Sequence, residues 1–280
     1  MLAQSWFGRM KRWSGLLRAC HPEPAVAVTL CAGLLALTSG RGAGSLLVLA
    51  AVGAGQLVVG WSNDYLDRDR DRLAGRRDKP VASGFVPAAS VRLAALLALA
   101  ACAPLSLLLG LAAAAAHAGA LVSALVYNWR GKFAPWSPLP YAVSFGLLPA
   151  IVSLSLQPPH LPAVWVMLAG ACIGVGGHFA QVLADIPEDR RQGSRGLPQL
   201  LGQRISVSVC AGSLLAATLL VTLGSGGPGG WRLVALAAAT CVTAAVPVTG
   251  FAGRLKLAFR LTLLVAGLAV VSFALGGGSV

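Results

Sequence analysis

Long apolar blocks alternate with short polar segments along the 280 residues of the chain. Nine blocks approach the ~20 apolar residues that a helix needs to cross a bilayer. Backbone groups in hydrocarbon must bond within their own segment, and these blocks are too continuous for the alternating strands of a membrane barrel. The pattern therefore predicts an all-α, polytopic membrane helical bundle with spans at 24–39, 43–62, 87–109, 111–127, 138–156, 162–184, 205–223, 230–250 and 256–275.

The basic residues predict the orientation of this bundle. With the N-terminus in the cytosol, all of the 22 Lys and Arg except Arg41 and Arg232 fall in cytosolic segments. This positive-inside bias predicts a cytosolic N-terminus and an outside C-terminus. We therefore expect a multi-pass protein of the cytoplasmic membrane of a prokaryote.

The composition is typical of a membrane protein and gives no indication of a nucleic-acid partner. Hydrophobic residues make up 56% of the chain and charged residues 11%, against about 25% charged in soluble domains. The net charge of +13 is explained by topogenic Lys and Arg and by contact with anionic membrane lipids. The charge therefore indicates no nucleic-acid partner.

The first twenty residues differ from the rest of the chain. Apolar side chains recur there at helical spacing, and the basic residues lie largely off that stripe. The pattern predicts an amphipathic interfacial segment at 1–20 and a nine-helix membrane domain at 21–280. Anchoring is favoured over substrate gating as its role; the stripe consists of Trp6, Met10, Trp13 and Leu17.

Acidic residues are few and clustered. Of nine in the chain, all but Glu23 lie in two cytosolic segments, which follow the second and the sixth span. Acids at a membrane boundary carry a solvation cost, so this clustering points to a function. The clusters are Asp64, Asp67, Asp69, Asp71 and Asp78, and then Asp185, Glu188 and Asp189.

The first cluster has the spacing of one helix face. If the second helix continues past Asn63, then Asn63, Asp67 and Asp71 recur every four residues, and Asp64 lies three before Asp67. Asp69 points the other way. Carboxylates gathered in this manner repel one another unless a cation is present, and oxygen ligands suit Mg²⁺ bound together with substrate phosphates.

The second cluster repeats this spacing less securely. Gln181, Asp185 and Asp189 are four apart, but Pro187 favours a kink or a restart of the helix. His178 is expected to be a helix-contact residue rather than a base. Because the second and sixth helices run in the same direction, both clusters emerge on one side and could face each other across a single cavity.

Basic residues accompany both clusters, including Arg76 and Lys79 after the first and Arg190 and Arg191 after the second. A metal–diphosphate needs oxygens around the cation and cations around the phosphate oxygens. Ordinary charged loops with internal ion pairs are the alternative, and the duplicated spacing on co-oriented helices disfavours it.

These motifs resemble those of the UbiA superfamily of intramembrane prenyltransferases. The match spans residues 20–275 and includes the nine predicted helices. Asn63-Asp64-x-x-Asp67-x-x-x-Asp71 looks like the first family signature and Asp185-x-x-x-Asp189 like the second. Two further stretches are similar to family segments: Lys79-Pro80 to Ser83-Gly84, and Tyr127-Asn128-Trp129-Arg130-Gly131-Lys132.

The resemblance implies Mg²⁺-dependent transfer of an isoprenyl group from an isoprenyl diphosphate to a small acceptor, through an allylic cation, at a site facing the cytosol. Two Mg²⁺ ions would be held by the acidic motifs. The implied metal ligands are Asn63, Asp64, Asp67, Asp71, Asp185 and Asp189. The implied diphosphate contacts are Lys79 and Lys132, then Arg76, Arg130, Tyr127 and Asn63. The five aspartates and Lys132 are the implied catalytic residues, whereas Asp69 and Glu188 are the acids least expected to be ligands.

Two other functions stay open at this stage. A terpene cyclase of the same superfamily would use the same metal machinery. A transporter or a non-enzymatic membrane protein is disfavoured, because the predicted spans contain almost no ionisable residues. His117 and His160 are expected on the far side and without a role, and Trp129 and Trp136 in the interfacial belt. Acceptor identity, isoprenoid length and oligomeric state are not readable from the sequence.

Overall fold

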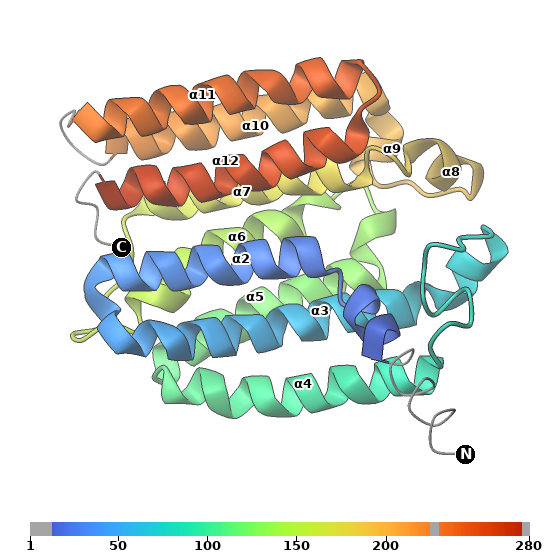
Figure 1. Cartoon of the computed structure of the whole chain (residues 1–280), viewed down its shortest axis with the longest axis horizontal. Helices are drawn as coiled ribbons and strands as arrows, with labels where there is room; N and C mark the ends of the chain where they lie inside the picture. The colour runs from blue at the N-terminus through green and yellow to red at the C-terminus, as the bar shows by residue number, and fades with distance from the viewer. Residues whose placement is uncertain (1–12, 225–229, 276–280) are drawn as a thin grey trace.

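A computed structural model describes residues 13–224 and 230–275, and its elements form a bundle of long helices lying side by side (Figure 1). Within these residues all regular secondary structure is helical. The long helices are α2 (Pro22–Ala36), α3 (Ser45–Leu73), α4 (Ala88–Leu108), α5 (Leu111–Trp129), α6 (Pro138–Ser153), α7 (Val164–Val182), α10 (Gln203–Gly224), α11 (Gly230–Phe251) and α12 (Leu255–Leu275). Two short helices, α8 (Ile186–Arg191) and α9 (Leu197–Leu201), join α7 to α10.

The predicted class of an all-helical, polytopic membrane bundle is confirmed. In the described chain, seven helical stretches are long and apolar enough to cross a membrane, with Pro22–Leu73 counted as one stretch. Pro138–Ser153 is a shorter apolar helix. Inside Pro22–Leu73 the chain turns back at Gly40, whose φ of 86° suits a residue without a Cβ, so that α2 and α3 lie alongside each other (Figure 1).

Apolar side chains face both inward and outward, as a lipid-embedded bundle requires. The largest buried cluster joins α2, α3, α5, α6 and α7 to α12, with Val48, Ile151 and Phe273 among its members. Large apolar side chains such as Leu108 and Leu219 are exposed on the outer faces of α4 and α10. The core thus lies between the helices, and the outer surface suits lipid.

The helices that carry the two acidic clusters end differently. α3 runs unbroken for 29 residues, about 43 Å, and includes Asn63 and Asp71, so the expected continuation of this helix is confirmed. α7 ends at Val182, and α8 begins at Ile186 with Pro187 in its first turn. Proline is tolerated there because the first amides of a helix have no intrahelical partner. The predicted interruption near Pro187 is therefore a restart.

The N-terminal segment packs on the protein, although Trp6 and Met10 of its predicted stripe lie outside the described residues. Residues 13–19 are helical, and Leu16 and Ala19 pack in a cluster with Val81 and Val86. Trp61 Nε1 on α3 donates a hydrogen bond to the Leu16 carbonyl oxygen at 2.9 Å. Trp13 and Leu17 are 65% and 63% exposed, so the opposite face is free to meet lipid.

Gly60 on α3 lies directly against the backbone of this segment at Cys20. A Cβ at Gly60 would lie 2.2 Å from the carbonyl oxygen of Cys20, a backbone atom that cannot swing away. We expect Gly60→Ala to destabilise the protein by about 1–3 kcal/mol and to lower its Tm by several degrees, because overpacking displaces the segment. Thermal unfolding in detergent measures this.

Gly212→Ala on α10 is the matched control, since a Cβ there meets nothing within 4 Å. Its Tm should equal or slightly exceed that of the unchanged protein, because alanine is the better helix former. Equal Tm values for the two variants would show that the N-terminal segment is not packed on α3 as described.

Candidate active site

A polar cavity of about 350 Å³ lies at the end of the bundle where α3 ends and α8 begins. The two acidic clusters meet in its wall, as the sequence predicted. Its lining includes most of the predicted site residues: Asn63, Asp67, Asp71, Arg76, Lys79, Tyr127, Lys132, Asp185 and Asp189. Asp64 and Arg130 are the two predicted residues that do not line it.

On the α3 side, the fourfold spacing presents three oxygen-bearing side chains to the cavity. Asn63 donates its amide nitrogen to Asn128 Oδ1 at 3.2 Å, which leaves its amide oxygen available to a cation. Asp67 Oδ1 forms a short ion pair with Lys132 Nζ, and both side chains are largely buried. Burial lowers the pKa of Lys132, while the neighbouring Asp67 carboxylate opposes that shift. Asp71 lines the cavity and forms no ion pair with any described residue.

On the α8 side, the carboxylates are held by bases from the first cluster. Arg70 Nη2 lies 2.6 Å from Asp189 Oδ1, and Arg76 Nη1 lies 3.1 Å from Asp185 Oδ1. Gln199 Nε2 donates to the other oxygen of Asp189 at 2.7 Å. Burial raises the pKa of Asp185, and Arg76 opposes that shift. Two arginines thus tie together segments that are more than a hundred residues apart in the chain.

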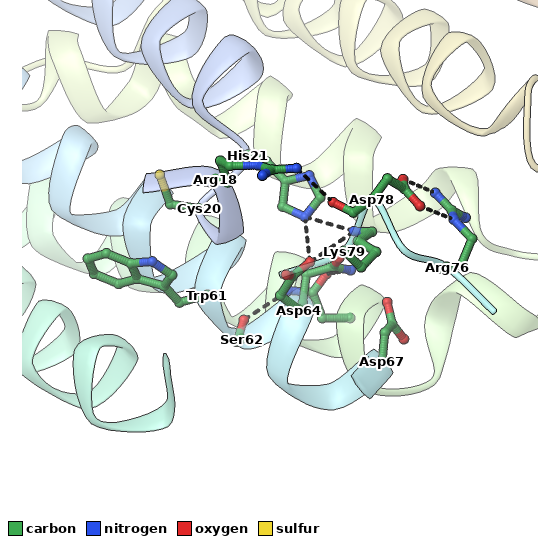
Figure 2. Close-up of polar contacts among 12 residues, drawn as sticks. Arg18, Cys20, His21, Trp61, Ser62, Asp64, Asp67, Arg76, Asp78 and Lys79 are labelled. Carbon is green, nitrogen blue, oxygen red and sulfur yellow. Dashed lines mark hydrogen bonds and ion pairs between the residues drawn. The ribbon is translucent and has the colours of Figure 1, made fainter. Parts of the chain in front are cut away.

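Asp64 does not line the cavity, although on a helix its direction differs from that of Asp71 by only about 20°. It is 2% exposed and contacts Lys79 Nζ at 2.9 Å and His21 Nε2 at 3.2 Å (Figure 2). Asp64 is therefore near the predicted face, its carboxylate contacts two bases, and its role as a metal ligand stays a prediction. Its contacts are with the base Lys79, which lines the cavity.

Arg130 is also displaced from the position expected for a diphosphate contact. α5 ends at Trp129, and the Arg130 guanidinium stacks 5.2 Å from the Trp129 ring centroid, away from the cavity. Asp69 pairs with Arg68 at 3.1 Å on the exposed side of α3 and does not line the cavity. Glu188, expected to be a weak candidate, does line it.

Sequence reasoning missed three basic side chains of the cavity. Arg18 comes from the N-terminal segment and His21 from the residue before α2, and neither position carried a signal of a site. Arg70 stands in an alternating Asp-Arg stretch, although its place three residues after Asp67 on the same helix could have identified it.

A less polar chamber continues from this cavity into the bundle. A second cavity of about 130 Å³ shares four wall residues with the first: His21, Asn63, Tyr127 and Gln181. Tyr141 donates its hydroxyl to Gln181 Oε1 at 2.7 Å, and the Tyr127 and Tyr141 rings meet edge to face with centroids 4.8 Å apart. A pair of tyrosine rings therefore lies between the charged cavity and the less polar interior.

Within the described residues, no three His, Cys, Asp or Glu side chains are grouped closely enough to hold a metal ion alone. Carboxylates of both clusters line the cavity; Asp67, Asp185 and Asp189 pair with bases, whereas Asp71 does not. Oxygen ligands spread over two walls suit Mg²⁺, which takes one or two carboxylates together with substrate phosphates rather than a complete protein cage.

Sequence comparison identifies the family. The pattern of the UbiA prenyltransferase family matches residues 25–254, most of the chain. The chain belongs to the UbiA prenyltransferase family. Digeranylgeranylglyceryl phosphate synthase of Natronomonas pharaonis is 29% identical over 221 residues, which cover 75% of this chain and 77% of that protein. The bacteriochlorophyll synthase 33 kDa chain of Cereibacter sphaeroides is 28% identical over 193 residues, covering 64% and 62%.

Solved structures agree with this fold. A UbiA homolog from Aeropyrum pernix K1 superposes with a TM-score of 0.73 at 24% identity, covering 90% of this chain and 98% of that one. A UbiA homolog from Archaeoglobus fulgidus bound to GPP and Mg²⁺ has a TM-score of 0.68 at 16% identity, covering 94% and 98%. The predicted family and the predicted enzyme class, a prenyltransferase acting on a prenyl diphosphate, are confirmed. The two relatives named above belong to different branches, so the branch stays undetermined.

Proposed function

We propose that this UbiA-family enzyme transfers an isoprenyl group from its diphosphate to a small acceptor, with two Mg²⁺ ions, at the cytosolic face of a prokaryotic cytoplasmic membrane. The proposal includes nine spans and a cytosolic N-terminus, which the distribution of Lys and Arg supports. One observation carries it: acids and bases from both motifs line a single cavity that is continuous with an apolar chamber.

The donor set of the cavity fits magnesium. Asn63, Asp67 and Asp71 would hold one ion from α3, and Asp185 with Asp189 the other from α8. Bound Mg²⁺ would neutralise charge on the diphosphate and make it a better leaving group. The Archaeoglobus fulgidus homolog bound to GPP and Mg²⁺ supports this proposal by its fold.

The bases of the cavity would bind the diphosphate oxygens. Lys79, Lys132, Arg70 and Arg76 all line it, and charge-assisted hydrogen bonds from such groups are the strong ones. Asp64 would act through Lys79, by holding its ammonium group in place. As the carbon–oxygen bond to the isoprenoid breaks, the electron pair leaves with the diphosphate, whose growing charge these bases stabilise.

The allylic cation would form at the junction of the two cavities, where Tyr127 and Gln181 line both walls. The largely apolar chamber below excludes water, which would otherwise capture the cation before the acceptor does. The acceptor then attacks the allylic carbon and releases a proton.

Purified protein with Mg²⁺ and prenyl diphosphates of several lengths, without and then with a panel of acceptors, tests the proposal. We expect a prenylated acceptor only when Mg²⁺ and an acceptor are both present, loss of product with EDTA, and recovery when Mg²⁺ is restored in excess. A cyclised hydrocarbon without acceptor would instead indicate a cyclase. If neither product nor diphosphate release occurs under any condition, the proposal is wrong.

A further inference from the structure

His178 on α7 is a buried polar side chain that the proposed mechanism does not use. It is 1% exposed, and its Nε2 lies 3.0 Å from the hydroxyl oxygen of Ser137, the residue before α6. Its other ring nitrogen, Nδ1, is buried and has no hydrogen-bond partner among the described residues. A buried polar atom without a partner costs free energy, so an apolar side chain would serve a helix contact better. Packing between helices therefore does not by itself account for a histidine at this position.

The hydrogen bond to Ser137 fixes the rotation of the imidazole ring. The same hydroxyl oxygen accepts the backbone N–H of Leu197, the first residue of α9, at 3.1 Å. Two residues further along, Gln199 donates to Asp189 of the second acidic cluster at 2.7 Å. Ser137 is completely buried, and a hydrogen bond there is stronger than in water. The ring is thus held by contacts that also reach the wall of the polar cavity.

The imidazole ring contacts both tyrosines that lie between the two cavities. Its centroid is 5.3 Å from that of Tyr127, edge to face, and 5.0 Å from that of Tyr141. Phe145, one turn after Tyr141 on α6, continues the row with a nearly parallel ring at 6.1 Å. Phe145 also lines an apolar cavity of about 100 Å³ between α2, α6, α7 and α12. The row of rings therefore extends from the His178 contact to the apolar interior.

His178 acts on the cavities only through these neighbours. Tyr127 lines the polar cavity and the less polar one beside it, and Tyr141 lines the less polar one and donates to Gln181. His178 lines neither cavity. Aromatic rings in contact prefer edge-to-face or offset arrangements, so a fixed ring favours one placement of the rings around it. The tyrosines consequently depend on His178 for their position at the junction.

We infer that His178 is a positioning residue: fixed by Ser137, it holds Tyr127 and Tyr141 where they keep water away from the allylic cation. The effect on the reaction rests on the proposed function, whereas the placement of the tyrosine rings does not. Without this support, water from the polar cavity would add to the cation and lose a proton. The product would then be a prenyl alcohol in place of the prenylated acceptor.

Turnover of a prenyl diphosphate with Mg²⁺ and without an acceptor measures this protection. The unchanged protein should form little prenyl alcohol. In His178→Leu and in Ser137→Ala we expect its formation to rise at least about tenfold, because a misplacement of about 1 Å changes rates by up to about 10²-fold. His178→Gln, whose amide can reach Ser137, should give an intermediate yield. The KM for the diphosphate should stay within about twofold, since neither residue lines the polar cavity.

Fluorine NMR of protein labelled with 3-fluorotyrosine reports on the rings without any turnover. The chain has three tyrosines, so the spectrum has three signals to assign. In Ser137→Ala the signals of Tyr127 and Tyr141 should shift or broaden. The signal of Tyr65, whose ring contacts Arg68 instead, should stay in place and show that the variant has folded.

His117→Leu is the matched control. His117 is also a buried histidine, with Nδ1 2.8 Å from the Ser106 hydroxyl, but its ring contacts no tyrosine among the described residues. This variant should change neither the alcohol yield nor the signals of Tyr127 and Tyr141.

Two results would overturn the inference: unmoved Tyr127 and Tyr141 signals in Ser137→Ala, or an alcohol yield in His178→Leu no higher than in His117→Leu. If the unchanged protein turns over no prenyl diphosphate under any condition, the proposed function fails. The NMR signals then decide alone whether His178 holds the tyrosine rings.

Discussion

Asp67→Asn is expected to reduce Mg²⁺-dependent release of diphosphate from a prenyl diphosphate by about 10²–10³-fold, the cost of losing one strong electrostatic contact in a pre-organised site. Asp67 lines the cavity and pairs with Lys132, whose side chain is only 10% exposed. The substitution therefore removes a carboxylate oxygen from the metal wall and leaves a buried ammonium group without its partner. Single-turnover release of diphosphate, measured at saturating Mg²⁺, gives the effect.

Asp69→Asn is the matched control, because it makes the same chemical change two residues away on the same helix. The Asp69 side chain is 65% exposed, pairs with Arg68 and Arg72, and does not line the cavity. Its rate should stay within about twofold of the unchanged protein, since exposed ion pairs contribute little. Similar losses in the two variants would mean that the cavity is not the site of the reaction.

Asp64→Asn and Lys79→Met are expected to lower kcat/KM by about 10²-fold each, and the double variant by no more than the worse single one. The reason is the 2.9 Å contact between Lys79 Nζ and the buried Asp64 carboxylate, which sets Asp64 behind the base that faces the cavity. Removing Lys79 removes the group through which Asp64 acts.

Steady-state kinetics of the four proteins with one prenyl diphosphate decide between this arrangement and direct metal ligation by Asp64. If Asp64 were a direct metal ligand, replacing it would lower kcat/KM whether or not Lys79 is present. The loss of kcat/KM in the double variant would then be about the product of the two single losses. With direct ligation, the Asp64→Asn variant would also need a higher Mg²⁺ concentration for its half-maximal rate. Multiplicative losses together with a raised Mg²⁺ requirement would contradict the positioning role.

The fold follows from local patterns that act over one or two turns. Continuous apolar blocks specify the helices, and the recurrence of Asn63, Asp67 and Asp71 specifies a helix that continues beyond its apolar block. The same spacing could not predict that the Asp64 carboxylate contacts Lys79 and His21, because these bases come from outside the helix.

The contacts that complete the site could not be predicted in this way, because they join distant parts of the chain. Arg70 and Asp189 are 119 residues apart, and Arg76 and Asp185 are 109 apart. No periodicity links such pairs; they meet only after α3 and α8 have packed at one end of the bundle. Arg130 was misplaced for a local reason, since α5 ends one residue before it and its guanidinium turns onto Trp129.

Among the described residues, those that line the polar cavity come from 18–199, whereas the apolar cavity between α2, α6 and α7 also needs α12. Chains are synthesised from the N-terminus, and their parts generally fold in that order. The charged wall is therefore complete while more than a quarter of the chain has still to be made. All the residues that we propose for diphosphate binding are thus synthesised before the helix that closes the apolar cavity.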